Sequence, residues 1–119
     1  MWHEVTRDRT LLERALRRHA GHHLYAIGDL DDAFFDRTTY HVARDTAGNV
    51  HATVAVYDGG GEPTMMALGG DASELEALAS LVPAVVRAVG RPIYAHVSPA
   101  LMPVIEALGS VSPRGPHER

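Results

Sequence analysis

Residues 64–97 have the pattern of a strand, a helix and a second strand, and this order constrains the fold more than any other part of the chain. "TMMALGG" (64–70) is a short apolar run that ends in two glycines, and "RPIYAHV" (91–97) has the composition of another strand. A helix that crosses between two strands of one sheet makes them parallel, and the connection is right-handed by strong default. The helix is indicated by apolar residues at helical spacing, which are Leu75, Leu78, Ala79 and Val82.

The residues before this unit predict an antiparallel meander. Residues 38–45 and 49–58 are rich in β-branched and aromatic side chains, and the turn sequence "TAGN" between them is typical of a hairpin. The first five residues predict a further short strand. The second strand of the hairpin alternates, so that one face carries Val50, Ala52, Val54 and Val56.

Helical spacing also predicts helices outside the crossover. One covers residues 10–19 and a short one covers residues 24–30. Pro83 is expected to kink or end the crossover helix, because proline cannot donate the backbone hydrogen bond of a helix interior. Ser98 is expected to be the N-cap of a last helix over residues 100–109, with proline at the first helical position.

Together these elements predict an α/β (α+β) fold of three layers. We expect a mixed, mostly antiparallel sheet of four to five strands with helices on both faces. The length of 119 residues fits one domain, which we expect to cover residues 1–109. Residues 110–119 have no periodic pattern, so we expect a tail or linker there.

The composition excludes several classes of function. The chain has no cysteine, which excludes disulfides, thiolate catalysis and cysteine-ligated zinc. Its formal net charge of −4 gives no support to a nucleic-acid-binding surface. No run approaches the roughly 18 apolar residues of a membrane span, and the chain start lacks the apolar segment of a signal peptide. We therefore expect a soluble cytoplasmic protein with no nucleic-acid or membrane partner.

Several weak features occur in an order that resembles a known family. The sequence has "GDL" after a short helix, a "TTY" strand, a "GD" turn before the long helix and "HVSPALM" at the end of strand 91–97. This order, over residues 20–108, resembles the N-terminal domain of two-domain proteins related to the GCN5-related N-acetyltransferases (GNAT). The resemblance implies a GNAT-like fold, and in such proteins a second domain, closer to the standard acetyltransferase, normally follows.

The resemblance also implies an acetyl-CoA cleft, in which backbone N–H groups at the start of the long helix receive the pyrophosphate. The family motif there is Arg/Gln-x-x-Gly-x-Gly/Ala. This chain keeps only Gly69 and Gly70, so these residues and Asp71 are a degenerate candidate turn for acetyl-CoA. The residues favour another interpretation, because an Asp71 cap with Glu74 would satisfy the first N–H groups and place two carboxylates where a phosphate would sit.

The family's catalytic positions are empty in this chain. The resemblance implies a Glu or a water on the sheet as general base and a Tyr on the helix after strand 91–97 as general acid. "TMMAL" (64–68) has no acidic residue and "ALMPVIEAL" (100–108) has no tyrosine. We therefore expect the chain alone to be inactive. Tyr94 and His96 share a face of strand 91–97 and are candidate ligand contacts, or ordinary strand residues.

The remaining polar clusters do not predict a metal site. His19, His22 and His23 have spacings that suit metal binding on a helix, but Ala20 and Gly21 interrupt that helix and no carboxylate completes the set. The aspartates of "GDLDD" (28–32) lack the spacing of a calcium loop. We expect no metal cofactor.

Strand 91–97 is expected to lie at an open sheet edge, which is a template for another strand. The tail carries Pro113 and Pro116 and is therefore expected to cover this edge poorly. We expect the strand to meet a catalytic GNAT domain or a second copy of the chain. Two functions stay open: a domain that assists an acetyl-CoA-dependent acyltransferase, and a non-catalytic binding or dimerisation module without acyl-CoA affinity.

Overall fold

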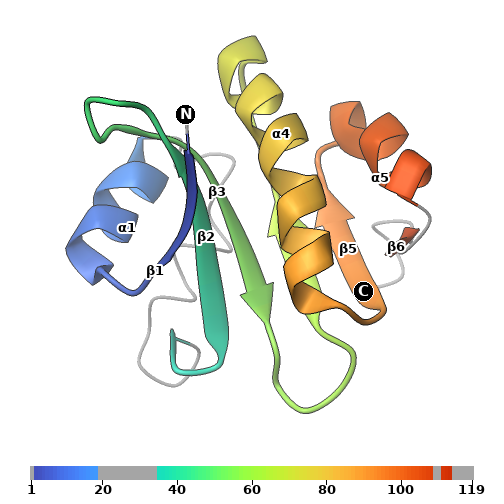
Figure 1. The fold of residues 1–119 in the computed structure, drawn as a ribbon. Coiled ribbons are helices and arrows are strands. Elements are labelled where there is room, and N and C mark those ends of the chain that lie inside the picture. Colours follow the sequence, from blue (N-terminus) through green and yellow to red (C-terminus); the bar gives the residue numbers. More distant parts are fainter. Residues whose placement is uncertain (1, 19–34, 109–110, 114–119) are drawn as a thin grey trace.

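The computed structural model describes residues 2–18, 35–108 and 111–113, which form a six-stranded mixed sheet (Figure 1). The strands follow one another across the sheet in chain order: β1 (Trp2–Thr6), β2 (Thr38–Arg44), β3 (Val50–Tyr57), β4 (Thr64–Ala67), β5 (Ile93–Val97) and β6 (Val111–Pro113). Neighbours from β1 to β4 are antiparallel, and β4, β5 and β6 are parallel. The helical segments are α1 (Arg9–Arg17), α4 (Ala72–Val89), the 3-10 turn η1 (Pro99–Leu101) and α5 (Met102–Leu108).

This architecture confirms the predicted α/β class, with a mixed, mostly antiparallel sheet between helices. The strand predicted at the chain start is β1, which pairs with β2. Within the described residues the sheet has six strands rather than four or five, because Val111–Pro113 adds a strand that the sequence did not predict.

The edge of β5 is partly covered. β6 pairs with it from Ile93 to Ala95, so the prediction of an open edge is wrong for these residues. The sequence prediction treated the prolines of the tail as an obstacle to strand pairing with β5. An outer strand, however, uses the hydrogen-bonding groups of one side only, and proline is tolerated in edge strands for that reason.

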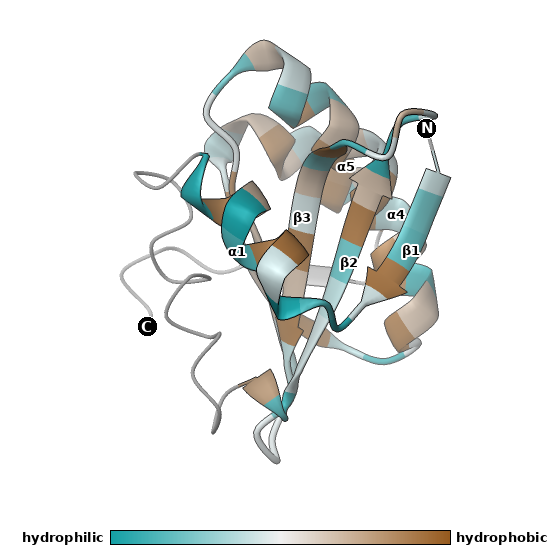
Figure 2. Cartoon of the chain, turned by 90° about the vertical axis from the view of Figure 1, so that its left-hand side faces the viewer, coloured by the Kyte–Doolittle hydropathy of each residue, from teal (hydrophilic) through white to brown (hydrophobic). Residues whose placement is uncertain are grey.

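Alternation along β3 divides the core between the two faces of the sheet. Val54 and Val56 belong to the cluster under α4, whereas Ala55 belongs to a second cluster with Leu12 and Leu16 of α1. Val50 also belongs to the second cluster, so the prediction that it shares the face of Val54 and Val56 is wrong, because the strand register shifts beside it at Arg44 of β2. Successive side chains of a strand point to opposite faces, so the two helices cover opposite sides. Figure 2 shows α1 and α4 on either side of the sheet.

Helix α4 does not end at Pro83, contrary to one of the two outcomes that the sequence predicted. Its apolar face is buried before and after the proline, at Leu78, Leu81, Val82 and Val85 among others. This burial offsets the one backbone hydrogen bond that a proline in a helix interior removes. The helix ends at Gly90, whose φ of 69° suits glycine and whose N–H donates to the carbonyl of Val86.

Some sequence predictions concern residues outside the described part of the chain. These are the helix over 24–30, the cluster of His19, His22 and His23, and the aspartates of residues 28–32. Across residues 2–18, 35–108 and 111–113, no helix is long and apolar enough to cross a membrane.

The predicted hairpin between β2 and β3 is confirmed, and Asp45 organises it. Asp45 Oδ1 accepts hydrogen bonds from the N–H groups of Ala47 (2.9 Å) and Asn49 (3.0 Å), and Oδ2 accepts one from His51 Nε2 (2.7 Å). The hydrogen bond from His51 is the largest cause that lowers the pKa of Asp45 to about 2, and the backbone donors add to it.

Asp45 should stabilise the fold in a pH-dependent way. Its pKa in the folded chain is lower than the value of about 3.9 in an unfolded chain, so its contribution is complete above about pH 5 and is lost as the pH falls toward 2. Asp45→Asn keeps an oxygen acceptor for the turn but removes the charge. In urea unfolding, this variant should have a lower midpoint than the wild type at pH 6, and the difference should shrink between pH 4 and 2.

The exposed Glu76 on α4 provides the control, and Glu76→Gln should keep the wild-type urea midpoint at pH 6. A gap between Asp45→Asn and the wild type that is the same at pH 6 and at pH 2.5 would contradict the assignment.

Candidate functional site

The turn between β4 and α4 is the candidate coenzyme site, and its backbone donors are bound within the chain. Gly69 N–H donates to Ser98 Oγ (2.8 Å), and Gly70 N–H donates to Glu74 Oε1 (2.9 Å). Glu74 N–H donates to Asp71 Oδ1 (2.8 Å). A phosphate at this turn would have to compete with three acceptors that the chain already supplies.

Asp71 is the N-cap of α4, as the sequence predicted. Glu74 lies in the first turn and is buried, with only 4% of its surface exposed. It differs from the usual partner in a capping box because it reaches Gly70 rather than the N-cap residue. Both carboxylates lie at the positive end of the helix dipole, where they are stabilised and where they oppose a bound anion.

Gly69 has a packing role. A Cβ atom at this position would lie 2.9 Å from Leu78 Cδ1 and 3.1 Å from Leu75 Cδ2. Those distances are shorter than normal van der Waals contacts, so a side chain would push the turn away from α4. The glycine is therefore explained by the close approach of the turn to the helix, without a phosphate.

Ser98 joins β5 to the same turn. Besides accepting from Gly69 N–H, its hydroxyl donates to the Gly69 carbonyl (3.3 Å), and its own N–H donates to the Ala67 carbonyl (3.0 Å). Ser98 occupies the N-cap position of η1, but its side chain makes no capping hydrogen bond, so that part of the prediction is wrong. The reason is the strand register: Ala67 pairs with Val97, which places the next residue of the chain beside the turn.

Tyr94 and His96 lie on β5 beside Thr64 and Met66 of β4, and both are half-buried. Their neighbour Ala95 packs into the core under α4. Because side chains alternate along a strand, Tyr94 and His96 share the opposite face, away from α4. The two candidate ligand contacts therefore point away from the helix that the turn begins.

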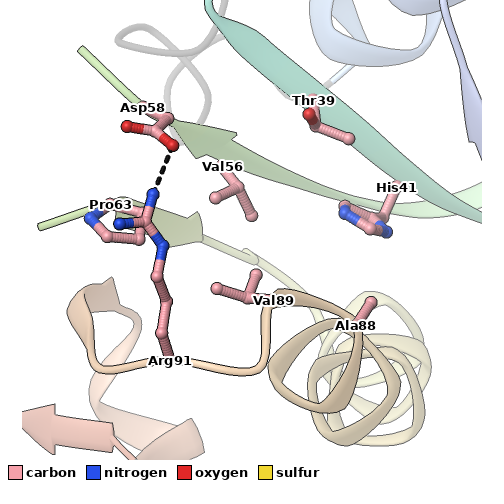
Figure 3. A pocket seen from close by; sticks show the side chains of 8 residues that line it. All are labelled: Thr39, His41, Val56, Asp58, Pro63, Ala88, Val89 and Arg91. Atoms are coloured by element: carbon pink, nitrogen blue, oxygen red, sulfur yellow. Dashed lines mark hydrogen bonds and ion pairs between the residues drawn. The ribbon is translucent and has the colours of Figure 1, made fainter. Parts of the chain in front are cut away.

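A separate pocket of about 250 Å³ lies at the C-terminal end of α4, on the face of the sheet that α4 covers (Figure 3). Val56 of β3 lies at its centre, Ala88 and Val89 line it from α4, and Thr39 and His41 project from β2. Pockets for drug-sized molecules typically measure roughly 300–1,000 Å³. This pocket suits a smaller ligand.

The polar groups of the pocket lie at two ends. At one end Arg91 forms an ion pair with Asp58, and about half of each side chain is exposed. At the other end burial lowers the pKa of His41, so its imidazole is neutral at pH 7. A neutral imidazole donates a hydrogen bond from one ring nitrogen and accepts at the other.

Sequence reasoning missed this pocket. From the sequence, His41 and Arg91 were placed only within the predicted strands 38–45 and 91–97 and were assigned no role. Asp58 and Arg91 are 33 positions apart in the sequence. They meet only because the chain after β3 and the chain after α4 reach the same end of the sheet, and no spacing motif records that.

The described residues contain no group of three His, Asp or Glu side chains that could hold a metal ion.

Comparisons with known proteins give one structural similarity. No family model matches the sequence, and no curated relative matches it. A solved structure from Deinococcus radiodurans R1, described as a "putative acetyltransferase", is 20% identical in sequence with a TM-score of 0.46. The match covers 67% of this chain and 62% of that chain, which is less than two thirds of that protein. At this level of similarity the match identifies no residue role.

Removal of the cap should destabilise α4. Asp71→Ala should lower the free energy of unfolding by about 1 kcal/mol, because Glu74 N–H loses its acceptor and the helix start loses a favourable charge. Ser73→Ala changes an exposed residue of the same helical turn and is the matched control. Urea unfolding should separate the two variants. If both are as stable as the wild type, Asp71 does not act as a stabilising cap.

Proposed function

We propose that this chain is a GNAT-related domain that lacks its own catalytic residues and assists an acetyl-CoA-dependent acyltransferase domain. The closed turn at the start of α4 carries the proposal. The N–H groups that would receive a pyrophosphate there, those of Gly69 and Gly70, donate to Ser98 and Glu74. Binding would break two hydrogen bonds, each contributing about 0.5–1.5 kcal/mol, and would displace a buried carboxylate.

The positions that the GNAT resemblance assigns to catalysis support the same proposal. β4 has the sequence "TMMA" and offers no acid as a general base. α5 has no tyrosine, and its one acidic residue, Glu106, is exposed. Acetyl transfer would therefore need a base, an acid and a coenzyme site from another domain.

In the assisting role, the chain shapes the acceptor site and covers one side of the cleft of its partner. The contact is proposed at the β5 side of the sheet. In the described part of the chain, β6 pairs β5 only from Ile93 to Ala95, so Val97 lies beyond that pairing, and backbone at a sheet edge can accept another strand. The partner is a catalytic GNAT domain or a second copy of this chain.

The second candidate is a non-catalytic binding or dimerisation module without acyl-CoA affinity. The observation that favours it is the pair of carboxylates, Asp71 and Glu74, at the positive end of α4. A site built to hold phosphates would leave that end open. In this role the sheet edge binds a partner that has no acyltransferase activity.

The chain alone should neither bind nor use acetyl-CoA. Calorimetric titration with acetyl-CoA should give no saturable heat, and incubation with acetyl-CoA and common amines should give no acetylated product above background. Asp71→Ala removes one of the two carboxylates, so any coenzyme binding it gains measures how far the cap blocks the turn. Turnover by the purified wild-type chain would overturn both candidate functions.

A second measurement separates the two candidates. The chain is crosslinked in its host, and the captured partner is purified and assayed for acetyl transfer with and without added chain. A change in kcat/KM that Val97→Asp abolishes and Arg87→Gln keeps would support the assisting role. A partner without acetyltransferase activity, or one whose kcat/KM does not change, would leave the binding module as the function.

A further inference from the structure

We propose that the pocket at the C-terminal end of α4 binds a free, zwitterionic α-amino acid with an apolar side chain. The pocket lies at the opposite end of α4 from Gly69 and Gly70, so the proposal does not depend on whether the chain binds acyl-CoA. Two opposite charges at one end, an apolar centre and neutral polar groups at the other end together define this ligand.

The charges match a zwitterion. Asp58 and Arg91 place a carboxylate and a guanidinium side by side, and neither uses its full hydrogen-bonding capacity on the other. Within the described residues, Asp58 Oδ2 accepts a hydrogen bond from Arg91 Nη2, and Asp58 Oδ1 accepts only a long one from Gly60 N–H (3.4 Å). The ammonium of an amino acid can bind Asp58 while its carboxylate binds the remaining N–H donors of Arg91.

The pair can admit a ligand without a large loss of stability, because about half of each side chain is exposed and ion pairs of this kind contribute little. The last turn of α4 adds a directional preference. Carbonyl groups at the C-terminal end of a helix carry partial negative charge and favour a cation nearby. Ala88 and Val89 of that turn line the pocket, so the helix end favours a cation in the pocket as a whole, and Asp58 supplies the carboxylate that the ammonium would contact.

A ligand with a single charge fits less well. An amine would match Asp58 but leave Arg91 without a new acceptor, and a simple carboxylate would match Arg91 but approach Asp58 and the negative end of α4. The charged end of the pocket has no net charge, and a zwitterion keeps it so.

The centre of the pocket suits an apolar side chain. Val56 and Pro63 are buried, and Val89 is half-buried against them. Figure 3 shows the valine side chains between the ion pair and β2. The volume of about 250 Å³ suits an amino acid with a side chain such as that of leucine.

Thr39 and His41 limit what the far end accepts. The hydroxyl and the neutral imidazole can hydrogen-bond a polar atom, but neither supplies a charge to pair with an ionised side chain. A lysine-like or glutamate-like side chain would therefore find no counter-charge at this end, and it would have to pass over the buried Val56 to reach it. The apolar centre, more than the far end, favours apolar over charged amino acids.

L-Leucine is the probe, titrated into the isotope-labelled full chain and followed by NMR at the His41 ring and at the methyl groups of Val56 and Val89. Saturable shifts confined to these groups are expected. 4-Methylpentanoate lacks the ammonium group, 3-methylbutylamine lacks the carboxyl group, and leucinamide keeps the ammonium but has an uncharged amide in place of the carboxylate. Each analogue should bind at least about tenfold more weakly, because it loses one set of charge-assisted hydrogen bonds.

Variants assign the binding to the ion pair. Asp58→Asn and Arg91→Gln should each weaken leucine binding about tenfold. The control is Arg87→Gln, which changes an exposed arginine in the last turn of α4 that does not line the pocket, and this variant should bind leucine as the wild type does. Unchanged spectra away from the pocket check that the variants are folded. The proposal is overturned if leucine causes no saturable shift at tens of millimolar, if a one-charge analogue binds as tightly as leucine, or if both pocket variants retain full affinity.

Discussion

Burial of the apolar face of α4 in the core cluster that it shares with β3, β4 and β5 is the interaction on which the rest of the structure depends. Leu78, Leu81 and Val82 are completely buried there, and each such side chain contributes about 1.5–3 kcal/mol relative to an exposed one. Because α4 connects β4 to β5, the same burial holds the two strands parallel and in register, with Ala67 beside Val97. That register decides which residues meet at each end of the helix.

At the N-terminal end the register brings Ser98 to Gly69, and the turn becomes a closed set of hydrogen bonds. The glycine pair that resembles a remnant of a coenzyme motif then has a structural explanation. Gly69 allows close packing against Leu75 and Leu78, and Gly70 N–H is held by Glu74. Packing and capping alone account for the features of this turn, which is why the proposed function assigns coenzyme binding to another domain.

Local patterns were sufficient to predict much of the fold. The alternation of β3 from Ala52 to Val56, the crossover over residues 64–97 and the Asp71 cap all depend on residues close together in the sequence, and all three were predicted. Val50 was predicted on the same face and lies on the other, because a register shift between β2 and β3 is not visible in the alternation. The predictions that were wrong would have needed information about which strands are neighbours in the sheet. The hydroxyl of Ser98 bonds to a residue 29 positions away, and β6 is stabilised by an edge that only the finished sheet provides.

The helix interior and the pocket make the same point at longer range. Pro83 is a local signal for a helix end, but α4 continues through it because the apolar residues on both sides of the proline are buried. Asp58 and Arg91 carry no recognisable spacing, and their pairing depends on where two connections leave the sheet. Sequence patterns record periodicity and capping well, but they do not record which loop ends lie side by side.

The two ends of α4 also differ in what they leave available, and this difference makes the two proposals compatible. The N-terminal donors are bound by side chains of the chain itself, whereas the C-terminal end borders a pocket with a partly exposed ion pair. The pocket is lined mainly by β2, β3 and α4, and the proposed partner contact lies at β5 and β6, toward the other edge of the sheet. A small ligand and a partner can therefore be bound at the same time, and α4, which shares one core cluster with residues of β3 and β5, is the element through which one could affect the other.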